Sequence, residues 1–392
     1  MQIDIKPLLL LSIILLSSAH GGTYWIAASG GSMGDGSQSN PFSSFETALK
    51  KTGGGHTFLF KPGYYTGQIT LFPKDGGTPQ NPTILKSQQK YKAILNGSPG
   101  HIIYARENCD WVIIDGFDIS GAFYTGVKFG GDYSVVRNCR IHNNALQGIE
   151  AHGRNNIVIE RNLIEYNGKN PQFDHGIYVG GQNITIRGNI IRFNSSIGIQ
   201  LVDKAAASVI ENNLIYANHK YAIWIDADSN STNRIINNTI VENRYGICFV
   251  RAGKDIVANN IIICGSSDYP AVLGFQRRDI NDVTVTNNLL KPLTGGFDSS
   301  NFTADPMFLN PAQGLFFLKQ DSPAIAKGSP QYAPGKDFFG QDRKTDSPVD
   351  LGCYTYNSAL LTPQATRQLY LGWAFHSLGN EIPDLWNFSA EK

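Results

Sequence analysis

The sequence predicts an all-β fold, a right-handed single-stranded parallel β-helix, and three observations support this prediction. Asparagine recurs through the middle of the chain in steps of 22 to 28 residues. Short aliphatic segments, such as Ile184, Ile186 and Ile190, alternate with polar residues between these asparagines. A small residue followed by isoleucine, as in Gly176-Ile177, opens the next segment. A repeat of this length is too short for paired helices, but it fits one coil of about three short strands.

The recurring asparagines predict the corners of the coils. The first asparagine of each copy lies at Asn138, Asn162, Asn189, Asn213, Asn238, Asn260 and Asn288, and a second lies at Asn143, Asn167, Asn194, Asn218 and Asn243. Stacked coils pair strand to strand at about 4.8 Å, so each asparagine is expected above the next, with its amide bonding the backbone of neighbouring turns. A leucine-rich repeat would need the spacing LxxLxLxxN, which the chain lacks.

The segments before and after the repeats predict that the chain has four parts. Residues 1–21 carry one Lys, an apolar run of nine residues and small residues up to Ala19, which predicts a signal peptide and a secreted or periplasmic protein. That run is too short for a membrane span of about 20 residues. Residues 22–300 are expected to form the β-helix, with a cap helix starting near Asn40-Pro41 and Ser43-Ser44. Residues 301–357 are expected to form a loop-rich cap at the end of the solenoid, and 358–392 an appendage of unknown role.

The bulk composition excludes several classes of protein. The formal charge is +1 and charged residues make up 17% of the chain, which argues against general affinity for nucleic acid or anionic membranes. The five cysteines show no CxxC spacing, so they indicate neither a disulfide framework nor a zinc site. We expect a monomer.

Strand alternation predicts one functional face. If the isoleucines of the Gly-Ile pairs point inward, the next residue of each strand points outward. Successive coils then expose a row about 20–25 Å long, enough for four or five sugar units. Its members are Lys128, Glu150, His152, Tyr178, Gln200, Lys204, Trp224, Asp226, Asp228 and Cys248.

The stretch PQFDHGIYVGG is the most unusual part of this face. It overlaps the longest gap of the repeat, between Asn167 and Gly176. The insertion GKNPQF in this gap is expected to form one wall of a groove. Removing the proton next to a uronate carboxylate needs a base, an acid and a cation. We assign His175 as base, Tyr178 as acid or second base, Lys204 or Lys128 as the cation, and Asp174 as the group orienting His175. The residues expected to bind substrate are Lys128, Glu150, His152, Gln200, His219, Trp224 and Asp226, and His219 is also an alternative to His175.

Each of these residues also has a structural interpretation. Asp174 and His175 would cap a corner by hydrogen bonding, Tyr178 would stack on its neighbours, and Trp224 would serve as outer packing.

Several segments together resemble a known superfamily. They are the PGYYTGQITL coil, the asparagine-rich coils and the ending DSPAIAKG…DFFGQDR…VDLGCYTY. Over residues 23–357 the chain is similar to the secreted right-handed parallel β-helix proteins, which include pectate lyases, chondroitinase B-like and alginate lyases, and mannuronan C5-epimerases. The resemblance implies a lyase or C5-epimerase acting on an acidic polysaccharide. The epimerases and some alginate lyases use a Tyr, Asp-Pro-His and Lys or Arg set, and here Asp174-His175 lacks the proline.

Two other functions remain open from the sequence. A glycoside hydrolase would need two carboxylates about 5–9 Å apart, and Asp226 with Glu150 or Asp174 would be the pair. A non-catalytic carbohydrate-binding or envelope protein would need no chemistry at all. No cofactor is expected. Calcium, which many β-helix lyases use, would have to bind Glu150, Asp226 and Asp228, because the chain lacks a dense run of acidic ligands.

Overall fold

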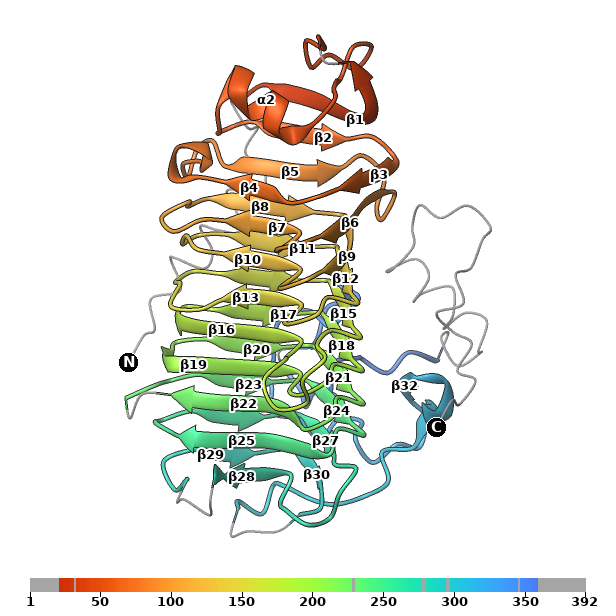
Figure 1. Ribbon diagram of the computed structural model, residues 1–392. Helices are drawn as coiled ribbons and strands as arrows, with labels where there is room; N and C mark the ends of the chain where they lie inside the picture. Colours follow the sequence, from red (N-terminus) through yellow and green to blue (C-terminus); the bar gives the residue numbers. More distant parts are fainter. Residues whose placement is uncertain are drawn as a thin grey trace.

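Each repeat forms one coil of three short strands, and the coils stack into a solenoid (Figure 1). This computed structural model describes residues 21–358 except 32, 228–229, 276–279, 294–296 and 345. The predicted signal peptide, but for residue 21, and the appendage after residue 358 lie outside the described residues. Asp228 also lies outside them.

Three parallel sheets run the length of the solenoid. Sheet A contains β1 (Thr23–Gly31), β2 (Thr57–Phe60), β5 (Thr83–Ser87), β8 (Val112–Asp115), β11 (Val135–Arg137), β14 (Val158–Glu160), β17 (Thr185–Arg187), β20 (Val209–Glu211), β23 (Arg234–Ile236), β26 (Ile256–Ala258) and β29 (Thr284–Thr286). Sheet B contains β3 (Gly63–Thr66), β6 (Ala93–Ser98), β9 (Asp118–Ala122), β12 (Arg140–His142), β15 (Leu163–Glu165), β18 (Ile190–Arg192), β21 (Leu214–Tyr216), β24 (Thr239–Val241), β27 (Ile261–Ile263) and β30 (Leu289–Lys291). Sheet C contains β4 (Ile69–Leu71), β7 (Ile103–Ala105), β10 (Val127–Phe129), β13 (Ile149–Ala151), β16 (Ile177–Gln182), β19 (Ile199–Ala206), β22 (Tyr221–Ala227), β25 (Tyr245–Arg251) and β28 (Val272–Gly274).

The core is a stack of aliphatic side chains inside the coils. The isoleucines that open successive strands of sheet C are in register and fully buried, as predicted; they are Ile149, Ile177, Ile199, Ile223 and Ile247. Because strand side chains alternate between faces, their neighbours in the sequence point outward. The burial of one residue per strand therefore sets the outer face of sheet C.

Two asparagine ladders hold the corners, as predicted. Asn213 shows the pattern: its backbone N–H and its Nδ2 donate to Oδ1 of Asn238 at 2.9 and 3.0 Å, and its Nδ2 also donates to the carbonyl of Ile186 at 2.8 Å. These bonds satisfy buried backbone groups that a tight corner would otherwise leave unpaired. One ladder consists of Asn162, Asn189, Asn213, Asn238, Asn260, Asn288 and Asn301, and the other of Asn144, Asn167, Asn194, Asn218 and Asn243.

The prediction was wrong by one residue in the first copy. Cys139, not Asn138, donates its N–H to Asn162, and Asn144, not Asn143, donates to Asn167. Asn138 and Asn143 instead take the positive-φ position before the ladder residue, at 55° and 51°. Asparagine tolerates this left-handed conformation well, so residue type alone does not separate the two positions.

A short helix lies at the N-terminal end of the solenoid (Figure 1). The helix α2 (Phe45–Thr52) begins after Ser44, whose side chain accepts a hydrogen bond from the Thr47 N–H at 3.1 Å. Its buried face brings Phe45 edge-on to Phe58, with ring centroids 4.9 Å apart. The helix therefore covers apolar side chains of the first coil.

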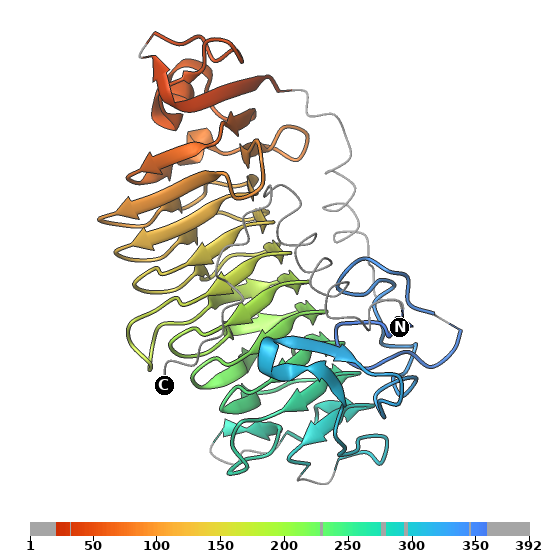
Figure 2. The same cartoon turned by 90° about the vertical axis from the view of Figure 1, so that its right-hand side faces the viewer.

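The segment after the last coil does not stay at the end of the solenoid, which differs from the expected end cap. Asn301 does extend the ladder, by accepting from the Asn288 N–H at 3.1 Å. The chain then turns back, and β31 (Phe308–Asn310), the 3₁₀ turn η3 (Pro311–Gln313) and β32 (Leu315–Leu318) lie beside the solenoid (Figure 2). There they and the following residues bury the outer face of sheet B in a second apolar cluster, consisting of Leu163, Ile190, Leu214, Tyr216, Val241, Ile261, Leu289, Phe308, Leu315, Phe316, Phe317, Leu318, Ala324, Phe338, Leu351, Cys353 and Tyr354.

Aliphatic outward residues of sheet B explain this placement. An aliphatic side chain on an outer face gains free energy when another segment covers it, at roughly 25 cal/mol per Å². Covering sheet B leaves sheet C as the face that carries the predicted row. Within the described part of the chain, no helix is both long and apolar enough to cross a membrane.

We expect Asn213→Ala to destabilise the protein by about 3 kcal/mol or more, because it leaves buried partners of the amide without hydrogen bonds. Urea unfolding measures this loss. Asn96→Ala is the matched control, since Asn96 is exposed and its amide makes one bond, to Ser120. Equal losses in the two variants would contradict the structural role of the ladder.

Candidate functional site

The outward residues of sheet C form the predicted row. Backbone pairing places them side by side on successive strands, in the order Thr70, Tyr104, Lys128, Glu150, Tyr178, Gln200, Trp224 and Cys248. We call this the Tyr178 row. Register thus confirms the predicted alignment, although Cys248 at the end of the row is fully buried.

A second outward row runs beside it, two residues further along each strand. The Arg106 N–H donates to the Leu71 carbonyl and the Gly130 N–H to the Ala105 carbonyl, which aligns Phe72, Arg106 and Gly130. On the next two strands, His152 and Gly180 are the residues two positions after Glu150 and Tyr178. We call this the His152 row. Its two glycines leave the backbone bare on either side of His152.

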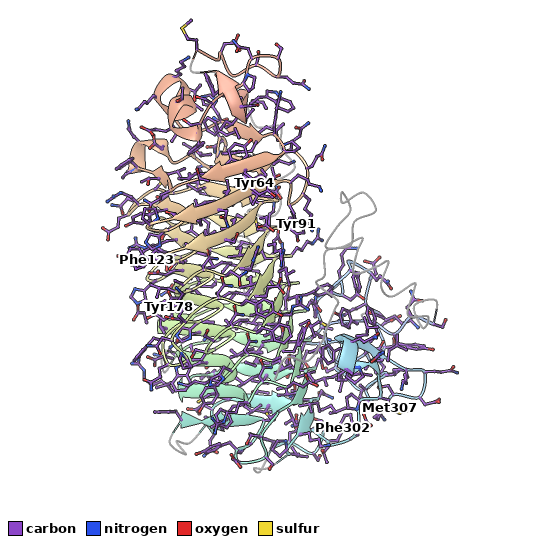
Figure 3. The ribbon with its side chains drawn as sticks, turned by 45° about the vertical axis from the view of Figure 1, so that its right-hand side comes forward. Tyr64, Tyr91, Phe123, Tyr178, Phe302 and Met307 are labelled. Carbon is purple, nitrogen blue, oxygen red and sulfur yellow. The ribbon has the colours of Figure 1, made fainter. Side chains whose placement is uncertain are left out.

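Tyr178 lies between two imidazole rings. The His152 ring stacks on one side, with centroids 5.5 Å apart and an angle of 6° between planes. The His175 ring lies at 5.8 Å and 28°. Both ring faces near Tyr178 are thus in contact with imidazoles, which favours a role for its hydroxyl over stacking on a sugar. Figure 3 shows Tyr178 on the edge of the solenoid.

The surroundings of Tyr178 keep its hydroxyl protonated. Burial, and then the carboxylates of Asp203 and Glu150, raise the pKa of Tyr178 above its ordinary value of 10.0. The phenol therefore carries a proton at neutral pH, the form that a general acid must have before it donates.

His152 contacts a carboxylate that strand alternation alone did not place beside it. Its Nε2 contacts the carboxylate of Asp203, two coils away. Gly180, the residue of the His152 row on the intervening strand β16, has no side chain of its own. The pair is accessible, with the His152 and Asp203 side chains 46% and 52% exposed. When Asp203 accepts the Nε2 proton, Nδ1 of the neutral imidazole keeps its lone pair.

Asp203 reaches the face because β19 is irregular. Strict alternation from Ile199 would turn Asp203 inward, but the pairing of β16 with β19 shifts register between Gly180 and Gln182. Asp203 has a φ of 55°. A bulge of this kind redirects a side chain, and no residue in the sequence marks it clearly.

His175 is placed differently from the base that the sequence predicted. The residue is 4% exposed, and its Nδ1 accepts a hydrogen bond from the Ile197 N–H at 3.4 Å. Burial, followed by the nearby charge of Lys220, lowers the pKa of His175 from 6.5 to about 4. A histidine with such a pKa is a weak base at neutral pH. These contacts suit a ring that supports Tyr178.

The insertion before His175 forms a wall, as predicted. Asp174 closes this loop, because its Oδ2 accepts from the N–H groups of Lys169 and Asn170 at 2.9 and 2.6 Å. These contacts lie within the loop and not with the His175 ring, so the orienting role expected for Asp174 does not follow. The loop borders a hollow of about 760 Å³ that is lined by Phe123, Tyr124, Ala145, Leu146, Lys169, Asn170, Pro171, Gln172 and Asp174. Phe123 lies N-terminal of Tyr178 along the same edge (Figure 3).

The remaining predicted residues have varied surroundings. Lys128 pairs with Glu150 at 2.8 Å, and Asp226 pairs with Arg251 at 2.6 Å. Trp224 packs against the rings of Tyr221 and Phe275, with both centroid distances 5.0 Å, which favours its interpretation as outer packing. Gln200 is half-buried beside Tyr178, and His219 is exposed on the turn before β22. Lys204 lies in β19, but its side chain is outside the described part of the structure.

Glu150 and Asp226 do not form a hydrolase pair. Glu150 and Asp226 lie on β13 and β22, three strand spacings or about 14 Å apart, which exceeds the 9.5 Å limit for such pairs. Asp174 is held in its loop.

The same separation does not fit calcium, which needs converging oxygen ligands. Among the described residues, no group of three or more His, Cys, Asp or Glu is arranged to hold a metal ion.

Comparisons with known proteins agree with this architecture. A family model described as "Right handed beta helix region" matches residues 91–240. Pectate lyase L of Dickeya chrysanthemi is 26% identical over 292 residues, which cover 68% of this chain and 64% of that protein. Pectate lyase L of Dickeya dadantii (strain 3937) gives the same identity and coverage. The chain therefore spans slightly less than two thirds of the length of these relatives.

Solved structures show the same fold at lower identity. Pectate lyase Pel9A superposes with a TM-score of 0.62 at 18% identity, covering 88% of this chain and 98% of that one. A rhamnogalacturonan lyase gives a TM-score of 0.50 at 13% identity, with coverage of 89% and 99%. With its three parallel sheets and its asparagine ladders, the chain has the right-handed parallel β-helix fold, and it is similar to the pectate lyases named above.

Proposed function

We propose that this protein is a secreted polysaccharide lyase that acts on the uronate residues of an acidic glycan at the outer face of sheet C. The observation that carries the proposal is the position of Tyr178 beside the His152–Asp203 pair, which brings a protonated hydroxyl and an accessible imidazole to one place. The relatives named pectate lyase L support the reaction class.

The chemistry assigns one proton transfer to each group. His152 Nδ1 takes the C5 proton of the uronate, while Asp203 accepts from Nε2–H and stabilises the imidazolium that forms. The electron pair from C5 forms the C4=C5 double bond as the C4–O4 bond breaks. Tyr178 donates its proton to the departing O4, and solvent then returns a proton to Tyr178 and removes one from His152.

Two lysines contribute positive charge for the substrate carboxylate, Lys220 more than Lys128, because Lys128 is paired with Glu150 at 2.8 Å. Lys128 lies two strands from Tyr178 in the same row, and Lys220 is close enough to His175 to lower the pKa of that ring. A cation near the carboxylate makes the neighbouring C5 proton more acidic. His175 acts as a positioning residue that holds the Tyr178 ring.

We expect polygalacturonate or alginate to yield an unsaturated, ultraviolet-absorbing product together with new reducing ends. Reducing ends alone would mean hydrolysis and contradict the proposal. Exchange of the C5 proton without cleavage, followed by NMR, would show a C5-epimerase that uses the same abstraction but not elimination. Inactivity on every acidic glycan would favour a binding protein and overturn the proposal.

His152→Ala and Tyr178→Phe should each lower kcat by about 10²–10⁴-fold, the usual contribution of a general acid or base, without changing thermal unfolding. The matched controls are His142→Ala and Tyr133→Phe. His142 pairs with Asp118 at 3.0 Å on sheet B, and Tyr133 stacks on Trp111 away from sheet C. Wild-type turnover in either site variant would remove that residue from the mechanism.

His175 predicts a pH dependence of stability. Its pKa is about 4 in the folded protein and 6.5 when unperturbed, so the unfolded chain binds more protons between these values. Stability should fall as pH decreases from 6.5 to 4, with a contribution from this group of up to about 1.4 kcal/mol per pH unit. Chemical unfolding of His175→Gln should show a shallower fall over this range than wild type. Identical slopes would show that His175 is not held neutral.

A further inference from the structure

Arg106 lies at the N-terminal end of the His152 row with its charge exposed. It follows β7, and its guanidinium lies over the rings of Phe72 and Tyr104, at 5.3 and 5.2 Å from their centroids. None of the ion pairs between described residues involves Arg106. Two aromatic rings therefore position a cation that has no carboxylate partner in the described chain.

The backbone between Arg106 and His152 is bare. Gly130 follows β10, the strand between β7 and β13, and its N–H donates to the Ala105 carbonyl at 2.7 Å. A Cβ at Gly130 would lie 2.6 Å from the carbonyl carbon of Arg106 and the nitrogen of Glu107. A residue larger than glycine does not fit at position 130 without moving the backbone. No side chain from this position therefore stands between Arg106 and His152. Two strand spacings put Arg106 about 10 Å from His152 along the row.

A hollow of about 620 Å³ adjoins Arg106. Its lining includes the exposed ring of Tyr64, which is 73% accessible and is labelled in Figure 3, together with Phe72, Gln68 and Thr70. Glu46 also borders the hollow, but its carboxylate pairs with Lys50 at 2.8 Å. Aromatic rings beside hydrogen-bonding side chains and a cation are groups suited to a charged sugar.

We propose that Arg106 binds the carboxylate of a second uronate residue of the same glycan, outside the reaction centre, with Phe72 and Tyr64 against the sugar rings. The guanidinium fork matches a carboxylate in two parallel hydrogen bonds. The glycan then runs along sheet C from His152 over Gly130 to the hollow beside Arg106. This subsite rests on the proposed function and defines its substrate as a chain with uronates on both sides of Gly130.

The test is affinity electrophoresis in gels containing polygalacturonate or alginate, combined with turnover of polymer and of short fragments. Arg106→Gln should weaken the apparent Kd for a recognised polymer by about tenfold, the loss of one charge-assisted contact. Arg106→Lys should recover part of the affinity, because it keeps the charge but not the fork. With the polymer, KM should rise while kcat stays unchanged. Fragments too short to reach from His152 to Arg106 should show no change.

Lys86→Gln is the matched control, because it removes the same charge from an exposed position of β5 on sheet A. Three outcomes would overturn the subsite. Arg106→Gln could be retarded as strongly as wild type, or Arg106→Gln and Lys86→Gln could lose affinity equally. In the third, neither polymer retards the wild-type protein at all.

The outcomes separate the two proposals. Retardation that depends on Arg106 without any unsaturated product would retain the subsite and remove the lyase chemistry. If Arg106→Gln forms the unsaturated product with unchanged affinity and KM, the lyase chemistry would be retained and the subsite removed.

Discussion

The buried asparagine ladders are the constraint on which the rest of this structure depends. Each amide links its own corner to the corners before and after it, as Asn213 does with Ile186 and Asn238. A coil that slipped by one residue would lose these bonds and would turn its aliphatic side chains outward. The ladders and the aliphatic stack therefore enforce the same register, and that register brings residues more than twenty positions apart in the sequence into straight rows on the surface.

In the candidate site, the surroundings of the side chains in one such row determine which of them carry protons. Tyr178 is an outward residue of β16 with two histidine rings beside it, and partial burial and nearby carboxylates raise the pKa of its hydroxyl. The two histidines beside it differ because their environments differ. His175 is buried and neutral, whereas His152 is accessible and paired with Asp203. The proposed function accordingly gives the two chemically identical rings different roles, one in positioning Tyr178 and one in proton transfer.

Charge pairing also determines where an acidic ligand would be held. Lys128 is already paired with Glu150 on this face, while the guanidinium of Arg106 is held by aromatic rings without neutralising its charge. Glycine at position 130 keeps the path between Arg106 and His152 open. The face is therefore not uniformly cationic, in keeping with the formal charge of +1, and attraction for a carboxylate is local.

The sequence by itself determined the repeat, the three-strand coil, the inward isoleucines and the row from Lys128 to Trp224, because each follows from a local period that burial enforces. It did not determine which asparagine occupies the ladder in the first copy, since Asn138 and Cys139 both suit a corner. Only the tertiary structure decided that the C-terminal segment covers sheet B rather than the end of the solenoid. Only the tertiary structure brought Asp203 to His152, because a register shift in β19 interrupts the alternation of its side chains. Such contacts join residues from different coils, and no local pattern records them.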